Sequence, residues 1–215
     1  MKKYKSIVFI ALVITVVLSA GFALNAYNKK QNKLFAGNFY KPTNEVVKQV
    51  ENPAPSLLFS STAKGYKYIP DLNALKEMEE KGEIPFKPLL ADVLGTPKYI
   101  KYRQQNSILY LVYFNKTIPP DKTFDNLINT GAVIIEEMPI KMSMKQAEDM
   151  FNGNVKSMEK IGGILHRTTI NEFPATYGGN IGHEVHWYNG KVLTTICTNK
   201  NVSFPVLFKL AKSMH

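Results

Sequence analysis

Apolar and polar residues alternate in short stretches over the second half of the chain, which is the pattern of strands that bury one face. The stretches are five to eight residues long, rich in Tyr, Ile, Leu, Val or Thr, and separated by turn-forming residues. The pattern predicts strands at 98–103, 108–115, 132–136, 155–159, 164–170, 173–177, 181–188 and 191–198. Most connections between them are short, which favours antiparallel pairing.

Apolar residues recur at helical spacing in three other segments. Each begins with a residue that is typical of a helix cap: Asp71, Ser143 and Ser203. The predicted helices run over 72–81, 144–151 and 204–214, and Gly153 is typical of the end of the second. The fold class that follows is α+β, with a mostly antiparallel sheet packed against two or three helices.

The dipeptide Asn189-Gly190, between the last two predicted strands, is the strongest turn signal in the chain. A two-residue type I′ turn needs positive φ at both central positions, and Asn and Gly tolerate it. A turn centred there places Trp187 opposite Val192.

This hairpin sorts its side chains onto two faces, because successive residues of a strand point to opposite sides. One face carries residues that we expect to be buried: Trp187, Val185 and Val192. The other carries residues that we expect to remain available to a partner: Glu184, His186 and Tyr188.

Residues 6–27 form an uncharged apolar block behind a basic start. As a helix, the 18 residues from Ile7 to Leu24 would rise about 27 Å, close to the roughly 30 Å hydrocarbon core of a bilayer. We expect residues 1–30 to be a membrane anchor. A cleaved signal peptide is the alternative, although this block is longer than the usual apolar region of such peptides.

The flanks of the span carry three lysines on each side, so the excess of cytoplasmic lysines does not fix the orientation. A short N-terminal tail is typical of a signal anchor whose long C-terminal part is exported. We therefore expect a single-pass protein with a stalk at 31–67 and an extracytoplasmic α+β domain at 68–215.

The formal net charge is +10, but the basic residues are spread along the chain. Only Arg103 and Arg167 among the 27 basic residues are arginine, and no Lys/Arg cluster of the kind that reads nucleic acid is present. We expect no nucleic-acid partner. A dispersed basic surface is compatible with an anionic cell envelope.

Four segments carry a resemblance to a known family: IPFKPLLADVLGTP, INEFPATYGG, HEVHWYNGKVLTTICT and SFPVLFKLAKSM. Over roughly residues 70–214 the chain resembles the exported bacterial domain of unknown function family number 4367. The family pattern is matched at Phe86, Pro88, Trp187, Ala211 and Ser213, whereas Ala91-Asp92 stands where a second proline is common. The resemblance implies a membrane-tethered envelope domain in a Gram-positive type of bacterium, often attached to regulatory or anti-sigma-like architectures. It supplies no catalytic residues.

The segment His183-Glu184-Val185-His186 half resembles the zinc motif His-Glu-x-x-His. That motif places its histidines on one face of a helix, whereas these are three apart in a predicted strand and so point to opposite faces. We expect neither a metal site nor a cofactor. Cys197, the single cysteine, is separated from His186 by several strand steps, so we expect no nucleophilic pair and assign no catalytic residue.

These observations favour a non-enzymatic binding or sensory/regulatory module of the bacterial envelope. It would contact the bilayer through residues 6–27 and bind an envelope protein, a lipid or a wall component. Two alternatives stay open: a secreted hydrolase or metal-dependent enzyme that uses the region of His183, Glu184 and His186 or Cys197, and a structural subunit of an envelope complex.

Overall fold

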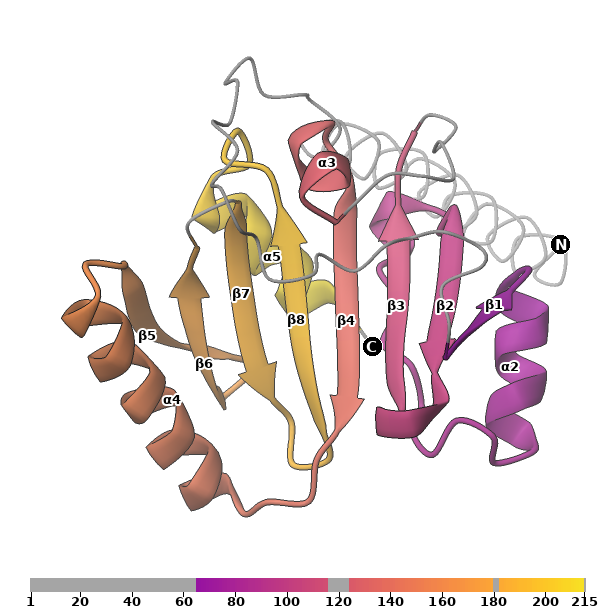
Figure 1. Cartoon of the computed structure of the whole chain (residues 1–215), viewed down its shortest axis with the longest axis horizontal. Coiled ribbons are helices and arrows are strands. Elements are labelled where there is room, and N and C mark those ends of the chain that lie inside the picture. Colours follow the sequence, from indigo (N-terminus) through magenta and orange to yellow (C-terminus); the bar gives the residue numbers. More distant parts are fainter. Residues whose placement is uncertain (1–64, 116–123, 180–181, 215) are drawn as a thin grey trace, which may run out of the picture.

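Eight antiparallel strands form one sheet in the computed structural model, which describes residues 65–115, 124–179 and 182–214 (Figure 1). The strands are β1 (Tyr66–Ile69), β2 (Tyr99–Arg103), β3 (Ile108–Tyr113), β4 (Val133–Pro139), β5 (Leu165–Ile170), β6 (Phe173–Gly178), β7 (His183–Tyr188) and β8 (Val192–Thr198). Their order in the sheet is β1-β2-β3-β4-β8-β7-β6-β5. Two four-stranded meanders therefore meet at the β4–β8 pair.

Four described helices cover the sheet: α2 (Leu72–Glu80), α3 (Phe124–Asn129), α4 (Met144–Lys160) and α5 (Phe204–Ser213). Two short 3-10 turns, η1 (Asp92–Leu94) and η2 (Gln104–Asn106), lie in the connections. Helices α2 and α5 pack on one face together with the segment around η1, whereas α3 and α4 lie on the other face (Figure 1). The expected α+β class with an antiparallel sheet is confirmed, but the described residues form four helices where two or three were expected, because α3 was not predicted.

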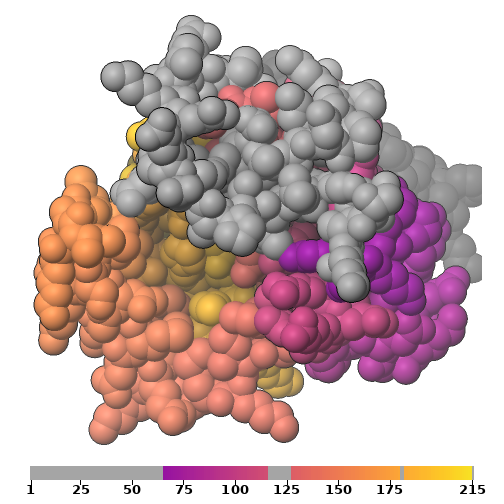
Figure 2. Space-filling view, viewed as in Figure 1, coloured from indigo at the N-terminus to yellow at the C-terminus, as the bar shows by residue number. Residues whose placement is uncertain are grey.

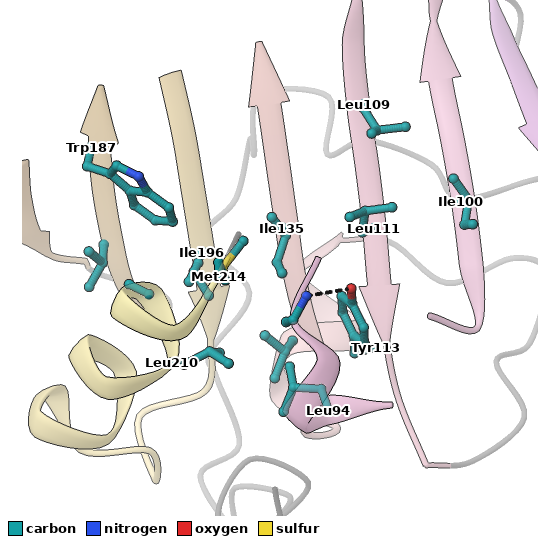
Figure 3. Packing of buried hydrophobic residues seen from close by; sticks show 14 of the residues in the cluster. Leu94, Ile100, Leu109, Leu111, Tyr113, Ile135, Trp187, Ile196, Leu210 and Met214 are labelled. Atoms are coloured by element: carbon teal, nitrogen blue, oxygen red, sulfur yellow. Dashed lines mark hydrogen bonds between the residues drawn. The ribbon is translucent and has the colours of Figure 1, made fainter. Parts of the chain in front are cut away.

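The main core lies between the sheet and α5 (Figure 3). Side chains from successive strands converge there, among them Leu111, Ile135, Ile196 and Trp187, each at most 3% exposed. Leu210 on α5 packs against the same cluster. Burial of this face confirms the side predicted for Trp187.

Two polar side chains fasten the segment around η1 to this core. The Tyr113 hydroxyl accepts a hydrogen bond from the Ala91 N–H at 3.2 Å (Figure 3). One carboxylate oxygen of Glu137 accepts from the Leu89 N–H at 2.9 Å. Glu137 is fully buried, and among the residues that the structure describes its second oxygen has no hydrogen-bond partner. Burial therefore raises the pKa of Glu137 to about 8.

Helix α4 is longer than predicted, and the strand expected at 155–159 is wrong. The capping box of Ser143 and Gln146 starts the helix as the sequence indicated. The helix then continues through Gly153, which is exposed and costs roughly 1 kcal/mol relative to Ala. Packing of Ala147 and Phe151 against the sheet offsets that cost, because it buries one face of the helix.

The N-terminal boundary of the sheet also differs from the expectation. Strand β1 begins at Tyr66, inside the range 31–67 that was expected to be a stalk, and pairs along its whole length with β2. The predicted anchor at 6–27 and the rest of the stalk lie outside the described residues. Within the part of the chain that is described, no helix is both long enough and apolar enough for a membrane span.

The hairpin of β7 and β8 turns one residue later than predicted. The Asn189 side chain accepts from the Lys191 and Val192 N–H groups at 3.1 and 2.9 Å, and its own N–H donates to the Val192 carbonyl. The turn is therefore centred on Gly190 and Lys191, with Gly190 at φ +92°. Trp187 pairs with Thr194, not Val192. The partner moves by two residues, so every side chain keeps its predicted face.

Tyr188 is not available to a partner, which corrects another expectation. Its side chain points to the predicted face, but α4 covers it there, with Phe151 in the same cluster. Its hydroxyl lies 3.0 Å from the Ile140 carbonyl and 2.8 Å from the Met142 carbonyl, and donates to this pair. The residues of α4 that cover Tyr188 lie within the predicted part of the helix, so the packing of α4 on this face, and not its extra length, buries the position.

Tyr188→Ala is expected to lower the free energy of unfolding by about 3–5 kcal/mol, because a large buried aromatic ring is removed. Tyr188→Phe keeps the ring and leaves the two carbonyls without their donor, so its expected cost is about 1–3 kcal/mol. Urea unfolding of both variants beside Trp187→Ala measures this. A Tyr188→Ala protein as stable as the unmodified chain would place Tyr188 on the surface.

Glu137 makes stability depend on pH. Its folded pKa of about 8 lies above its ordinary value of 4.5, so its contribution is fully present below about pH 4.5 and is lost as pH rises through about 8. The loss is at most about 5 kcal/mol. Glu137→Gln should flatten the fall in unfolding free energy between pH 5 and 8.5, whereas Glu77→Gln, on the exposed side of α2, should not. An unchanged slope in Glu137→Gln would show that the carboxyl ionises freely in the fold.

Candidate functional site

One position on every strand lines up in a single row across the sheet. The register pairs these residues one after another, and aligned residues of neighbouring strands point to the same face. We call them the polar row, since every member can form hydrogen bonds: Tyr68, Lys101, Tyr110, Glu136, Thr195, His186, Thr176 and Arg167.

The polar row lies between two small apolar clusters on the face opposite to α5. On one side Ile134 and Cys197 pack with α3. On the other side Leu193 and Tyr188 pack with α4. Figure 2 shows the surface hollowed over the gold atoms of β7 and β8, between the orange atoms of α4 and β5 and the magenta atoms of the first meander. The polar row therefore crosses the part of this face that the two described helices leave between them.

The centre of the row is formed by His186 and Thr195. Two side chains of the next residue pair, Glu184 and Cys197, lie beside them. His186 Nδ1 lies 2.9 Å from Thr195 Oγ1, and His186 Nε2 lies 3.2 Å from Glu184 Oε2. The side chains of His186 and Glu184 are 26% and 30% exposed. The Cys197 thiol donates to the other oxygen of Glu184 at 3.5 Å. A partly exposed imidazole is thus held by a hydroxyl on one nitrogen and a carboxylate on the other.

Glu136 brings a second carboxyl to this centre. Burial raises its pKa above the ordinary range, and the charge of Glu184 acts in the same direction. A hydrogen bond from the Tyr110 hydroxyl and the nearby His186 oppose this effect. Burial and Glu136 together raise the pKa of Tyr110, so its hydroxyl remains a donor. The two carboxyls are therefore close enough to repel one another.

Cationic groups and aromatic rings lie at the end of the row that belongs to the first meander. The Lys101 ammonium and the Arg103 guanidinium lie 5.8 and 5.7 Å from the centre of the Tyr66 ring, within the range of a cation–π contact. Tyr66 in turn lies 6.1 Å from Tyr110. Lys101 is only 2% exposed, and burial lowers its pKa.

The far end of the row is fixed to α4. The Arg167 guanidinium donates to the Ala175 carbonyl at 3.2 Å and lies 5.5 Å from the centre of the Phe151 ring. This arginine therefore ties α4 to β5 and β6. The cations Lys101 and Arg167 therefore lie toward the two ends of the row, while Glu136 lies at its centre with Glu184 beside it.

The side chains at the centre have the order of a nucleophilic site, but the sheet supplies no backbone donors beside them. Thr195, His186 and Glu184 have the order of a nucleophile, a base and an orienting carboxylate. Strands β7 and β8 have a partner on each side, so their N–H groups belong to the sheet. Backbone donors for an oxyanion are therefore not provided at this point of the sheet. Across residues 65–115, 124–179 and 182–214, no three His, Cys, Asp or Glu side chains are grouped to hold a metal ion.

Of the residues singled out in the sequence, Glu184, His186 and Cys197 lie at this centre, and His183 does not. Cys197 lies opposite Glu184, two positions from the partner of His186, so the expected separation of several strand steps between Cys197 and His186 was too large. His183 points to the α5 side, where its Nδ1 lies 2.7 Å from the Val202 carbonyl and its ring stacks on Phe204. The prediction that the two histidines lie on opposite faces is confirmed. His183 holds the start of α5 against the sheet.

Glu136, Tyr110 and Thr195 were missed as site residues. A signal existed for Glu136, because two acidic residues, Glu136 and Glu137, interrupt an otherwise apolar strand in VIIEEMP and must point to opposite faces. It did not indicate a site, since nothing local in the sequence shows that β4 lies beside β8.

The chain was compared with protein family models, with curated proteins and with solved structures, and none of them matches it.

Proposed function

We propose that the chain is a membrane-tethered, extracytoplasmic binding or sensory module of the bacterial envelope, and that it is not an enzyme. Its ligand would bind at the centre of the polar row through a protonated amine. The polar row is the observation that supports this proposal best, because it places several hydrogen-bonding side chains in a hollow on an otherwise apolar face.

The charges at the centre favour a cationic group. Glu136 and Glu184 contribute two carboxyls, and their immediate neighbours in the sheet are hydroxyls, a thiol and one imidazole. An ammonium placed between the carboxyls would relieve their repulsion and form charge-assisted hydrogen bonds. Such bonds are stronger in a partly desolvated hollow than at an open surface.

Binding of an amine would also move a proton. A nearby cation favours the ionised form of a carboxyl, so it would lower the raised pKa of Glu136. Binding would therefore release protons at a pH at which part of the Glu136 population is protonated.

The expected membrane anchor would add to this function. Holding the module at a bilayer raises its effective concentration toward a ligand at the same surface, so a weak amine site would be sufficient.

Isothermal titration of the full chain in detergent with cadaverine, a diamine, tests the proposal. Glu136→Gln and Glu184→Gln are each expected to weaken binding at least about tenfold, since each removes a charged hydrogen-bond acceptor. Glu148→Gln makes the same charge change on the exposed side of α4 and should bind like the unmodified chain. The heat of binding should also depend on the ionisation enthalpy of the buffer, because protons are released.

Diacetylated cadaverine has no charge and is expected not to bind. Equal binding of the acetylated and free diamines, or binding that neither glutamate variant weakens, would contradict an amine site at the polar row.

A further inference from the structure

A second site lies at the end of the sheet, away from the centre of the polar row. A groove of about 1160 Å³ opens where the segment 85–89, the connection between β4 and α4, and the β7–β8 turn meet. Its apolar lining includes Phe86, Leu89, Ile140, Met142 and Val192. This volume is somewhat larger than that of most ligand pockets, which span about 300–1,000 Å³. The groove is large enough for an extended apolar chain.

The backbone along the groove is already hydrogen-bonded. The Tyr188 hydroxyl lies within hydrogen-bond distance of the Ile140 and Met142 carbonyls, and the Ile140 N–H donates to the Lys191 carbonyl at 3.0 Å. The Asn189 side chain accepts from the Lys191 and Val192 N–H groups. A peptide that adds as a strand needs free main-chain partners, and the main-chain groups named here are already bonded within the fold. The lining therefore favours an occupant with a hydrocarbon chain over one with a peptide backbone.

Three lysines give the groove its charge. Lys87, Lys141 and Lys191 come from the three separate segments, and all three are exposed. No acidic residue lines the groove, and none of these lysines forms an ion pair within the described part of the chain. An anionic group at the mouth would complement this charge, and its hydrocarbon chain would cover the apolar lining.

We propose that this groove binds an anionic phospholipid, with one acyl chain against Phe86, Leu89 and Met142 and the phosphate beside Lys87, Lys141 and Lys191. A soluble phosphate would leave the apolar lining uncovered, and a zwitterionic lipid would bring its own cation to the lysines. The site is independent of the polar row, so an amine ligand and a lipid could be bound together.

Photolabelling of the full chain in phosphatidylcholine nanodiscs tests the proposal. The probe is a phosphatidylglycerol with a diazirine on its acyl chain, and cross-linked peptides are identified by mass spectrometry. Labels are expected within 85–89 and 139–143. Lys87→Gln, Lys141→Gln and Lys191→Gln combined should reduce labelling there at least fivefold. Lys145→Gln, Lys156→Gln and Lys160→Gln combined make the same charge change on exposed positions of α4 and should leave it unchanged.

Two competitors distinguish binding of a phospholipid from binding of its free headgroup. Dihexanoyl phosphatidylglycerol should displace the label, whereas glycerophosphoglycerol, the same headgroup without chains, should not. Three results would each overturn the lipid site: equal labelling by a phosphatidylcholine probe, displacement by the headgroup alone, or no label within the two groove segments. Displacement by an acidic peptide at lower concentration than the lipid would assign the groove to a protein partner instead.

Discussion

The pairing of β4 with β8 is the interaction on which the rest of the structure depends. Within each meander the paired strands follow one another in the chain, whereas β4 and β8 are separated by α4, β5, β6 and β7 and join the two meanders into one sheet. Ile135 meets Ile196 on the core face of this pair, and Glu136 meets Thr195 on the other. One strand pairing therefore completes the main core and the polar row at the same time.

The two faces of the sheet differ in how completely they are buried, because different helices cover them. Helices α2 and α5 and the segment around η1 bury one face with a continuous apolar cluster. Helices α3 and α4 bury only separate patches of the other face, and the polar row crosses between them. A carboxyl such as Glu136 is costly to ionise in such a place, as its raised pKa reflects. An apolar residue there would add more stability than a carboxyl does, so Glu136 is consistent with the proposed binding role.

The sequence alone predicted the features that depend on neighbouring residues in the chain: most strands, the faces of their side chains and the helix starts. Alternation located most strands, and it put Trp187 and Tyr188 on opposite faces. Asp71 and Ser143 marked helix starts because their side chains accept N–H groups of the first turn. The turn of the last hairpin was placed one residue too early, since the Asn189 side chain bonds to the loop in a way that propensity does not encode.

Tertiary contacts decided the remaining features. Packing on the sheet carried α4 through Gly153 and buried Tyr188, which the sequence had indicated as exposed. Half of the candidate site was predicted, because Glu184 and His186 are two residues apart on one strand and so point to the same face. The other half comes from β3, β4 and β8: the β7–β8 hairpin brings Thr195 beside His186, and only the order of strands brings Glu136 and Tyr110 to them. Strand order across a sheet is non-local, so alternation within each strand could not supply it.

The single native cysteine allows a direct measurement of the β4–β8 register. Cys197 lies directly opposite Ile134, and directly opposed Cα atoms are about 4.5–5.5 Å apart, within the range that a disulfide spans. Oxidative refolding of Ile134→Cys should therefore form an intramolecular disulfide with Cys197, detected by mass spectrometry of the digested protein. Ile135→Cys, one residue along and on the opposite face, should not. A disulfide in Ile135→Cys, or none in Ile134→Cys, would contradict the register that assembles the polar row.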